Sequence, residues 1–256
     1  MQQIVLLPKI YGQYQNRLFS VIKSDIEPLI SELDVSMDYH ITHNNRIHVN
    51  ITGADSEFVS NLLAKEYGTT MPFFNFEQGK KYAGQLLDIG KVGYGLYVDI
   101  GIQDNKRTDA LVTLHSLRKQ LEMDDSSLRE IIDVHVFTDN LPIEIEIINI
   151  NPNDKTIDAA LSDTMIKRYQ EWISDDHERL IILGVTKKMI ESVLRKTNHT
   201  TDIFSIEALG RFEFALQCKR TTRATGIVSS IGPYLRGVPI NLFIPHEVQE
   251  KKDVSS

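Results

Sequence analysis

The sequence predicts a multidomain α+β protein, in which a five-stranded β-barrel lies between a small α+β N-terminal domain and an α/β C-terminal domain. Its 256 residues are more than one compact domain usually holds and suit two or three small ones. Hydrophobic residues recur at both helix and strand spacing in the first segment, mainly at strand spacing in the middle, and at both spacings again near the end. We expect domains at residues 1–71, 72–163 and 164–248, followed by a frayed polar tail at 249–256.

The N-terminal segment alternates between strand and helix signals in the order β-α-β-β-α. An apolar run at residues 3–10 comes first, and apolar residues then recur at helical spacing from Leu18 to Leu33. Residues 35–42 and 47–51 alternate as two strands of a hairpin. A second amphipathic helix starts near Asp55 and ends before a glycine, so these residues predict a small α+β sandwich.

The middle segment is dominated by strand signals separated by glycine-rich turns. One helical excursion, from Ser116 to Asp133, interrupts them. About five strands with one such excursion suit a five-stranded barrel. The first expected strand ends at Ile89. The other four cover residues 96–100, 110–114, 142–148 and 155–161.

The third segment mixes two helices with several short strands. The first helix carries Met165, Tyr169 and Trp172, and Thr186 caps the second one. The expected strands cover residues 179–183, 203–208, 211–219, 225–231 and 240–244.

Composition and charge limit the classes of protein. Hydrophobic residues make up 41% and charged residues 25%, as in ordinary soluble proteins with folded cores. The single cysteine, Cys218, permits no intrachain disulfide, which favours a reducing compartment. No run approaches the roughly 20 apolar residues that span a bilayer, and the first residues lack the basic segment of a signal peptide. We therefore expect a cytoplasmic protein without membrane contact.

Several motifs of the middle segment occur in a fixed order. Gly79 and Gly84 are five positions apart, and Gly95-Leu-Tyr-Val98 follows a glycine-rich turn. Ala110-Leu-Val-Thr-Leu-His-Ser-Leu117 and a closing Leu161-Ser162 come later. In this series the segment resembles the S1 family of RNA-binding OB folds, over roughly a third of the chain. The resemblance implies a five-stranded S1-like OB barrel that binds RNA.

Three positions depart from the S1 pattern. The turn between Ile89 and Gly95 is longer than usual, and the family's frequent histidine is replaced by Thr113. The basic position before the closing Leu-Ser is the acidic Asp158. These departures concern the binding face of the barrel more than its fold.

The chain as a whole resembles an archaeal family designated domain of unknown function 2110. The resemblance is carried by Leu6-Leu-Pro-Lys-Ile10, by Gly90-Lys-Val-Gly-Tyr-Gly95 and by Gly210-Arg-Phe-Glu-Phe214. It implies an archaeal source and relatives, without an activity.

We expect a non-enzymatic RNA-binding protein associated with translation or RNA processing. Exposed aromatics can stack on unpaired bases, and neighbouring cations can hold phosphates. The expected contacts on the barrel are Lys80, Lys81, Tyr82, Lys91, Tyr94 and Tyr97. The alternative for the tyrosines is that they pack within the barrel or against a neighbouring domain.

A basic cluster near the C-terminus is the second expected RNA contact. The formal net charge of −7 excludes coating of nucleic acid by charge alone, so cations have to be concentrated locally. The alternative is a solvated face that maintains solubility. Phe212 and Phe214 alternate with charged residues, so we expect these two in the core with the charges outside. The cluster comprises Arg211, Lys219, Arg220, Arg223 and Arg236.

The expected partner is single-stranded or structured RNA. The ribosome or another RNA–protein assembly is a further possible partner. A protein-interaction adaptor without direct RNA contact is the rival hypothesis, which the negative charge and Asp158 favour.

We expect no catalytic, metal or cofactor site. His40 and His43 would point to opposite faces of a strand, and neither they nor His48 has a completing ligand at a usual spacing. The glycines form no complete nucleotide-binding motif, and the motifs of common hydrolases are missing. A metal-dependent nuclease with scattered carboxylate ligands stays open as a third possibility.

Overall fold

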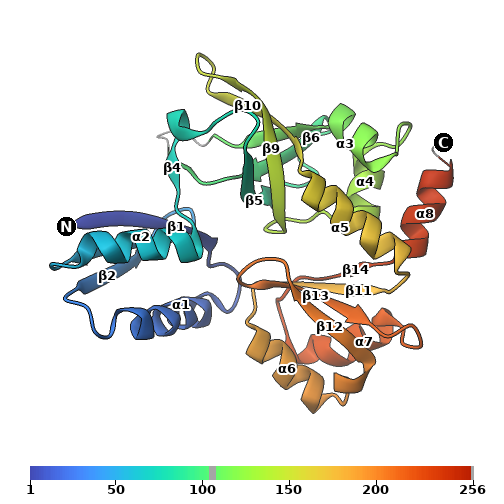
Figure 1. The fold of residues 1–256 in the computed structure, drawn as a ribbon. Coiled ribbons are helices and arrows are strands. Elements are labelled where there is room, and N and C mark those ends of the chain that lie inside the picture. Colours follow the sequence, from blue (N-terminus) through green and yellow to red (C-terminus); the bar gives the residue numbers. More distant parts are fainter. Residues whose placement is uncertain (104–107, 255–256) are drawn as a thin grey trace.

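A computed structural model describes residues 1–103 and 108–254 of the chain. Figure 1 shows an N-terminal domain in blue, a β-barrel in teal to yellow and a C-terminal domain in yellow to red. The predicted α+β class and the central five-stranded barrel are confirmed. Among the described residues, no helix combines the length and apolar character that crossing a bilayer requires.

The N-terminal domain has the predicted order β-α-β-β-α. Its antiparallel sheet has the strand order β1-β3-β2. Alternation along β3 turns Ile47, Val49 and Ile51 toward the core that both helices help to form. The elements are β1 (Gln2–Lys9), α1 (Gln15–Ile30), β2 (Ser36–Ile41), β3 (Arg46–Thr52) and α2 (Ser56–Tyr67).

The barrel closes in the strand order β10-β8-β6-β5-β9. Its first strand, β5, pairs with β9 along residues 81–85 and with β6 along residues 85–87, so it bends from one half of the barrel to the other. The elements of this part are β4 (Met71–Pro72), η1 (Phe73–Asn75), β5 (Lys81–Leu87), β6 (Gly95–Asp99), β7 (Ile102–Gln103), β8 (Ala110–Thr113), α3 (Leu114–Leu121), α4 (Leu128–His135), β9 (Pro142–Asn151) and β10 (Thr156–Leu161).

The helical excursion predicted at residues 116–133 is two helices. The first ends where Glu122 takes a left-handed backbone conformation, with φ of 57°. The second begins at Leu128 and is capped by Ser127, whose hydroxyl accepts from the backbone of Glu130 while the Glu130 carboxylate accepts from the backbone of Ser127. This capping box starts a new helix direction that hydrophobic spacing alone does not reveal.

The C-terminal domain is built on an antiparallel sheet in the order β12-β13-β11-β14. Leu180 and Ile182 of β11 face the core formed with α6 and α7, whereas Ile181 and Leu183 face the barrel side. The elements are α5 (Asp163–Ser174), β11 (Arg179–Leu183), α6 (Lys187–Lys196), η2 (Thr200–Asp202), β12 (Ile203–Ala208), β13 (Glu213–Cys218), α7 (Ala224–Ile231), η3 (Gly232–Tyr234), β14 (Ile240–Phe243) and α8 (Pro245–Val254).

Two expectations for this domain were wrong. Residues 225–231, expected as a strand, belong to α7, which buries Ala224, Ile227 and Ile231 at helical spacing. The tail expected to be frayed from residue 249 is helical to Val254, because Val248 is buried and two lysines of α8 form ion pairs with barrel glutamates. Residues 255–256 lie outside the described part of the chain.

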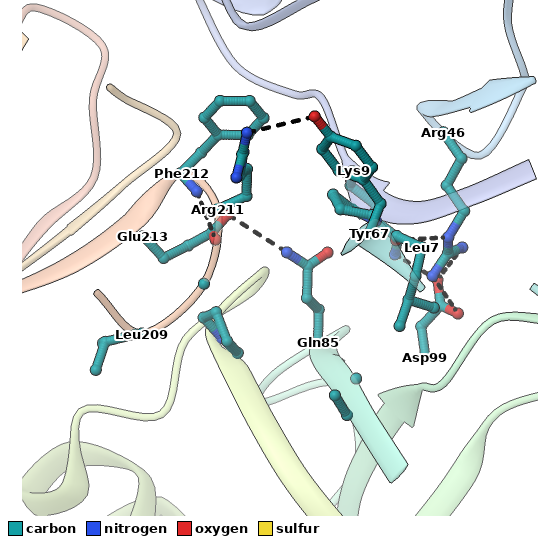
Figure 2. Close-up of a pocket in the computed structure, with 15 residues that line it drawn as sticks. Leu7, Lys9, Arg46, Tyr67, Gln85, Asp99, Leu209, Arg211, Phe212 and Glu213 are labelled. Atoms are coloured by element: carbon teal, nitrogen blue, oxygen red, sulfur yellow. Dashed lines mark hydrogen bonds and ion pairs between the residues drawn. The ribbon is translucent and has the colours of Figure 1, made fainter. Parts of the chain in front are cut away.

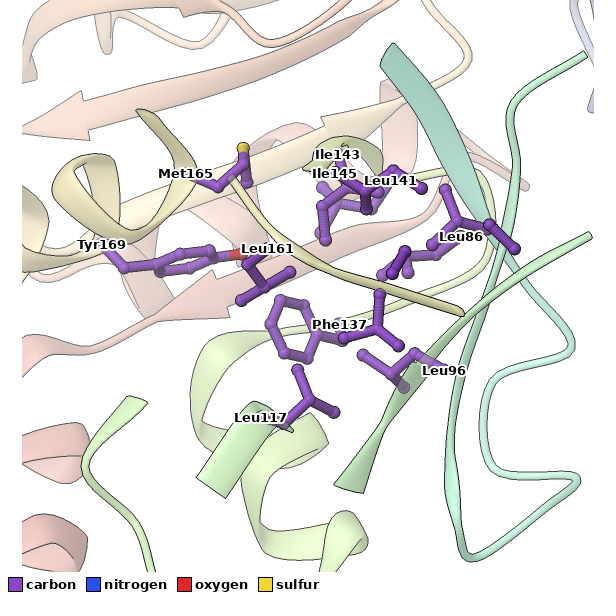
Figure 3. Close-up of a cluster of buried hydrophobic side chains, with 14 of the residues drawn as sticks. Leu86, Leu96, Leu117, Phe137, Leu141, Ile143, Ile145, Leu161, Met165 and Tyr169 are labelled. Carbon is purple, nitrogen blue, oxygen red and sulfur yellow. The ribbon is translucent and has the colours of Figure 1, made fainter. Parts of the chain in front are cut away.

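The barrel and the C-terminal sheet share one hydrophobic core, part of which Figure 3 shows. Helix α5 supplies the connection, since Tyr169 contacts the ring of Phe137 from the barrel region and the ring of Phe243 from β14. The relative position of these two domains is therefore fixed by ordinary core packing.

The N-terminal domain is joined to the others through Phe212, which immediately precedes β13. Its side chain is fully buried in the core of the N-terminal domain, among residues of α1, β1 and β3. Exchange for alanine would leave a cavity between two domains.

We predict that Phe212→Ala lowers the free energy of unfolding by about 3–5 kcal/mol, as expected for a buried phenylalanine. Urea denaturation checks this value. Phe204→Ala is the matched control, because Phe204 lies on the neighbouring strand β12 and its side chain is 68% exposed. Equal effects of the two substitutions would show that Phe212 does not join the domains.

Candidate functional site

Two tyrosines, one exposed and one half-buried, form a pair on the outer face of the barrel. Tyr97 points outward from β6 because its neighbours Leu96 and Val98 are buried in the barrel core. Tyr94, at the end of the β5–β6 loop, is 53% exposed. The rings meet edge to face with centroids 6.3 Å apart, and the hydroxyls are 2.6 Å apart. The hydrogen bond with Tyr94, burial and the carboxylate of Asp109 raise the pKa of Tyr97.

The loop beside this pair carries one of the expected cations. Lys91 is 70% exposed and forms an ion pair of 2.6 Å with Asp88. Gly90 adopts a positive φ of 79°, a conformation that glycine takes without strain. Gly95 is required for another reason: a Cβ atom here would lie 2.4 Å from the carbonyl oxygen of Val112 on β8.

The remaining expected barrel residues lie at the other end of β5. Lys81 pairs with Glu146 of β9, six residues or roughly 20 Å along the strand from Leu87. Tyr82 is half-buried against Phe76, and its hydroxyl accepts a hydrogen bond from the backbone of Glu77. Lys80 is exposed beside Lys81. The structure therefore separates these three residues from Tyr94 and Tyr97.

The C-terminal basic residues divide into two groups. Lys219, Arg220 and Arg223 are exposed on the loop between β13 and α7, and Arg236 is exposed after η3. Arg220 donates to the backbone oxygen of Asp175.

Arg223 forms an ion pair of 2.7 Å with Glu178, which also accepts from the backbone of Ala224. Arg211 lies elsewhere, in the junction between domains. It forms an ion pair with Asp25 and stacks over the ring of Tyr67 at 5.0 Å.

The histidines show a relationship that the sequence did not predict. His40 and His48 are cross-strand partners of β2 and β3, with ring centroids 4.2 Å apart. Burial and the neighbouring His40 lower the pKa of His48. Across the described ranges, no three His, Cys, Asp or Glu side chains gather as a metal site.

All three domains meet at a junction that Figure 2 shows. Asp99 of β6 accepts a bidentate pair of hydrogen bonds from Arg46, at 2.8 and 2.9 Å, and pairs with Lys9 at 2.5 Å. Burial alone would raise the pKa of Asp99, but the hydrogen bonds and charges of Arg46 and Lys9 hold it well below its usual value. This ion triad binds the N-terminal sheet to the barrel.

Glu213, the first residue of β13, is buried at the same junction. Its Oε1 accepts from the Tyr11 hydroxyl at 2.6 Å and from Gln85 at 3.4 Å, and its Oε2 accepts from the backbone of Phe212 at 3.1 Å. Burial raises its pKa to about 7, although the hydrogen bonds from Tyr11 and Phe212 act in the opposite direction. The expectation that the charges around Phe212 and Phe214 lie outside was wrong at this position.

Strand alternation concealed Glu213, because the turn before β13 sends Phe212 into the N-terminal core and leaves Glu213 buried between Tyr11 and Gln85. The only signal in the sequence is an isolated acid between two phenylalanines.

The closed barrel with this strand order, between two parts that each combine helices with a sheet, defines an α+β protein with a central OB-type barrel. The chain belongs to the DUF2110 family. Its models match as the DUF2110 N-terminal domain at residues 3–72, the DUF2110 central domain at 76–173 and the DUF2110 C-terminal domain at 177–242.

Several solved structures are similar to parts of the chain. GSP13 from Bacillus subtilis is 17% identical with a TM-score of 0.25, over 36% of this chain and 59% of that one. A chain of the a/eIF2alpha–aDim2p–rRNA complex from Pyrococcus horikoshii is 11% identical with a TM-score of 0.25, over 48% and 64%. The intact alpha subunit of aIF2 from Pyrococcus abyssi is 10% identical with a TM-score of 0.23, over 66% and 97%. No curated protein matches the sequence.

We predict that the buried carboxyl of Glu213 makes stability depend on pH. Its pKa is about 7 in the folded state and 4.5 as the ordinary value. A raised carboxyl pKa means that the folded protein holds the proton more tightly, so this contribution is complete below pH 4.5 and is lost as the pH rises toward 7. The loss amounts to about 3 kcal/mol.

The measurement is the free energy of unfolding of the wild type and of Glu213→Gln between about pH 4.5 and pH 8. We expect the wild type to lose stability relative to the variant as the pH rises. Parallel curves for the two proteins would contradict the assignment.

Proposed function

We propose that this protein binds single-stranded RNA on the outer face of its barrel, without an enzymatic activity. The observation that carries the proposal is the pair of exposed Tyr94 and half-buried Tyr97, beside and on β6. OB barrels bind oligonucleotides on the face formed by their second and third strands, which here are β6 and β8. The barrel resembles the S1 family, and this resemblance supports an RNA that takes part in translation or RNA processing as the partner.

The geometry of the pair suits base stacking. The contact between the two hydroxyls holds both rings in a fixed relative orientation, which reduces the side-chain entropy lost on binding. Stacking of a base on an aromatic ring contributes roughly 1–3 kcal/mol and works with any base. We therefore infer binding with little sequence preference.

Phosphate contacts are expected from cations that remain exposed. Lys91 lies on the loop that leads to Tyr94, so it is the nearest candidate. Lys219, Arg220 and Arg223 would form a second contact for a longer or structured RNA. Lys80, Lys81 and Arg236 are exposed outside both groups, and we give them a secondary role. One buried cysteine fits a reducing compartment, so we place the protein in the cytoplasm.

A protein-interaction adaptor is the second candidate, and the strand β9 favours it. Glu146 is half-buried on its outer side, and Ile148 further along is exposed. An acidic surface with an exposed apolar residue suits a basic protein partner better than RNA.

We predict that Tyr94→Ala combined with Tyr97→Ala weakens binding of a fluorescein-labelled single-stranded RNA by about 10-fold or more, because two stacking surfaces are removed. Fluorescence anisotropy across a salt series measures the dissociation constant. Tyr234→Ala is the matched control, since Tyr234 is 52% exposed and lies in the C-terminal domain. If the control and the double variant lose affinity equally, the barrel face is not the RNA site.

We predict a different effect for Lys219→Glu combined with Arg220→Glu. This charge reversal should weaken binding at low salt and lower the slope of log affinity against log salt concentration by about 1–2, because two cations no longer neutralise phosphates. The same anisotropy titrations measure both quantities. An unchanged slope would remove the loop between β13 and α7 from the RNA-binding surface.

A further inference from the structure

One edge of the N-terminal sheet is free to pair with another strand. The sheet has the order β1-β3-β2, so β1 and β2 are its two edges. The outer side of β1 is partly covered by the segment before β4, because the amide of Leu7 donates to the carbonyl oxygen of Gly68 and the amide of Thr70 to that of Val5. No strand of the described residues pairs with the outer side of β2. Such an edge is a template for a further strand.

The strand β2 lacks the features that usually block an edge. Its sequence, Ser36-Met-Asp-Tyr-His-Ile41, contains neither proline nor lysine, and its register with β3 runs over the whole strand without a bulge. The edges of the C-terminal sheet differ, since β12 has a register shift between Ile203 and Ser205 and β14 has only four residues. Among the described edge strands, β2 therefore offers the longest regular surface that is free to pair.

The backbone groups on this free side can be assigned from the hairpin. Thr42, directly after β2, donates its amide to the carbonyl oxygen of Arg46 at 2.8 Å, so its backbone faces β3. Successive residues of an antiparallel strand alternate between facing their partner and facing away. The amides and carbonyls of Met37, Tyr39 and Ile41 therefore point to the free side.

We propose that this edge pairs with β2 of a second copy of the chain, antiparallel about a two-fold axis at Tyr39. Tyr39 then pairs with its own counterpart, and Met37 pairs with Ile41 of the second copy. All the residues whose backbone faces the free side thereby form hydrogen-bonded pairs, with about six backbone hydrogen bonds between the copies. Other registers that obey the same alternation leave at least one of these residues unpaired. A two-fold interface of this kind is self-complementary.

The polar side chains of β2 match in this register. Asp38 lies opposite His40 of the second copy, and symmetry repeats the pair. Both side chains are exposed, on the face of the sheet away from the helices. The pair is of the non-hydrogen-bonded type, in which the Cα atoms are about 4.5 Å apart. The imidazole N–H can donate to the carboxylate, and the two groups attract each other when the imidazole is protonated.

The apolar side chains of β2 match on the opposite face. Ile41 is 37% exposed, and the residue opposite it in the second copy, Met37, is half-buried. Pairing removes this apolar surface from water. The ring of Tyr39 already meets the ring of Phe19 edge to face, with centroids 6.4 Å apart, so its position is set before the copies meet. The strand is therefore complementary to itself in its backbone and on both faces.

Sedimentation velocity of the full chain across a wide concentration series tests the proposal. We expect a species of twice the chain mass that dissociates on dilution. Ile41→Lys should abolish this dimer, because it places a charge on the edge and opposite Met37 of the second copy. The substituted side chain is exposed, and an unchanged circular dichroism spectrum would verify the fold. Phe204→Lys, on the edge strand β12, is the matched control and should leave the mass unchanged.

An exchange of side chains tests the register itself. His40→Asp sets two carboxylates opposite each other at both symmetry-related positions and should weaken the dimer at least about 10-fold. Adding Asp38→His restores the opposed pair with its members exchanged, and should return the dissociation constant to within about 3-fold of the wild type. A chain that stays monomeric at every concentration would overturn the proposal. So would a dimer that Ile41→Lys leaves intact, or one that the exchange fails to restore.

Discussion

The turn between β12 and β13 determines how the three domains are arranged. Phe212 enters the core of the N-terminal domain, and the next residue, Glu213, is buried against Tyr11 and Gln85. One hairpin tip of the C-terminal domain thus contacts both other domains. A buried carboxyl is tolerated here because each of its oxygens receives a hydrogen bond, and because its raised pKa allows the neutral form near neutral pH. The ion triad around Asp99 joins the N-terminal sheet to the barrel.

This junction uses several basic side chains that would otherwise be available to a polyanion. Arg46 and Lys9 are committed to Asp99, and Arg211 is paired with Asp25. In a chain of net charge −7, the cations that remain exposed near the tyrosine pair are few. RNA binding by this barrel face therefore has to draw more on base stacking than on charge, and its dependence on salt should be moderate.

Local patterns predicted much of the fold, but not the contacts between domains. Glycine spacing and strand alternation were sufficient for the barrel, and apolar periodicity for the N-terminal domain. The helix α7 was missed because a short apolar run with the β-branched residues Ile227 and Val228 fits strand and helix equally. The candidate tyrosines could be selected from sequence. Glu213 and the pair of His40 and His48 could not, since they depend on a turn and on a strand register.

The most direct test of RNA binding on the barrel face is to locate the RNA on the protein. Backbone amide chemical shifts of ¹⁵N-labelled protein, recorded during titration with a short single-stranded RNA, report every contact surface at once. We expect the largest changes at Tyr94, Tyr97 and the loop from Asp88 to Gly93. Changes confined to the outer side of β9, or no changes at a saturating RNA concentration, would contradict binding at the tyrosine pair.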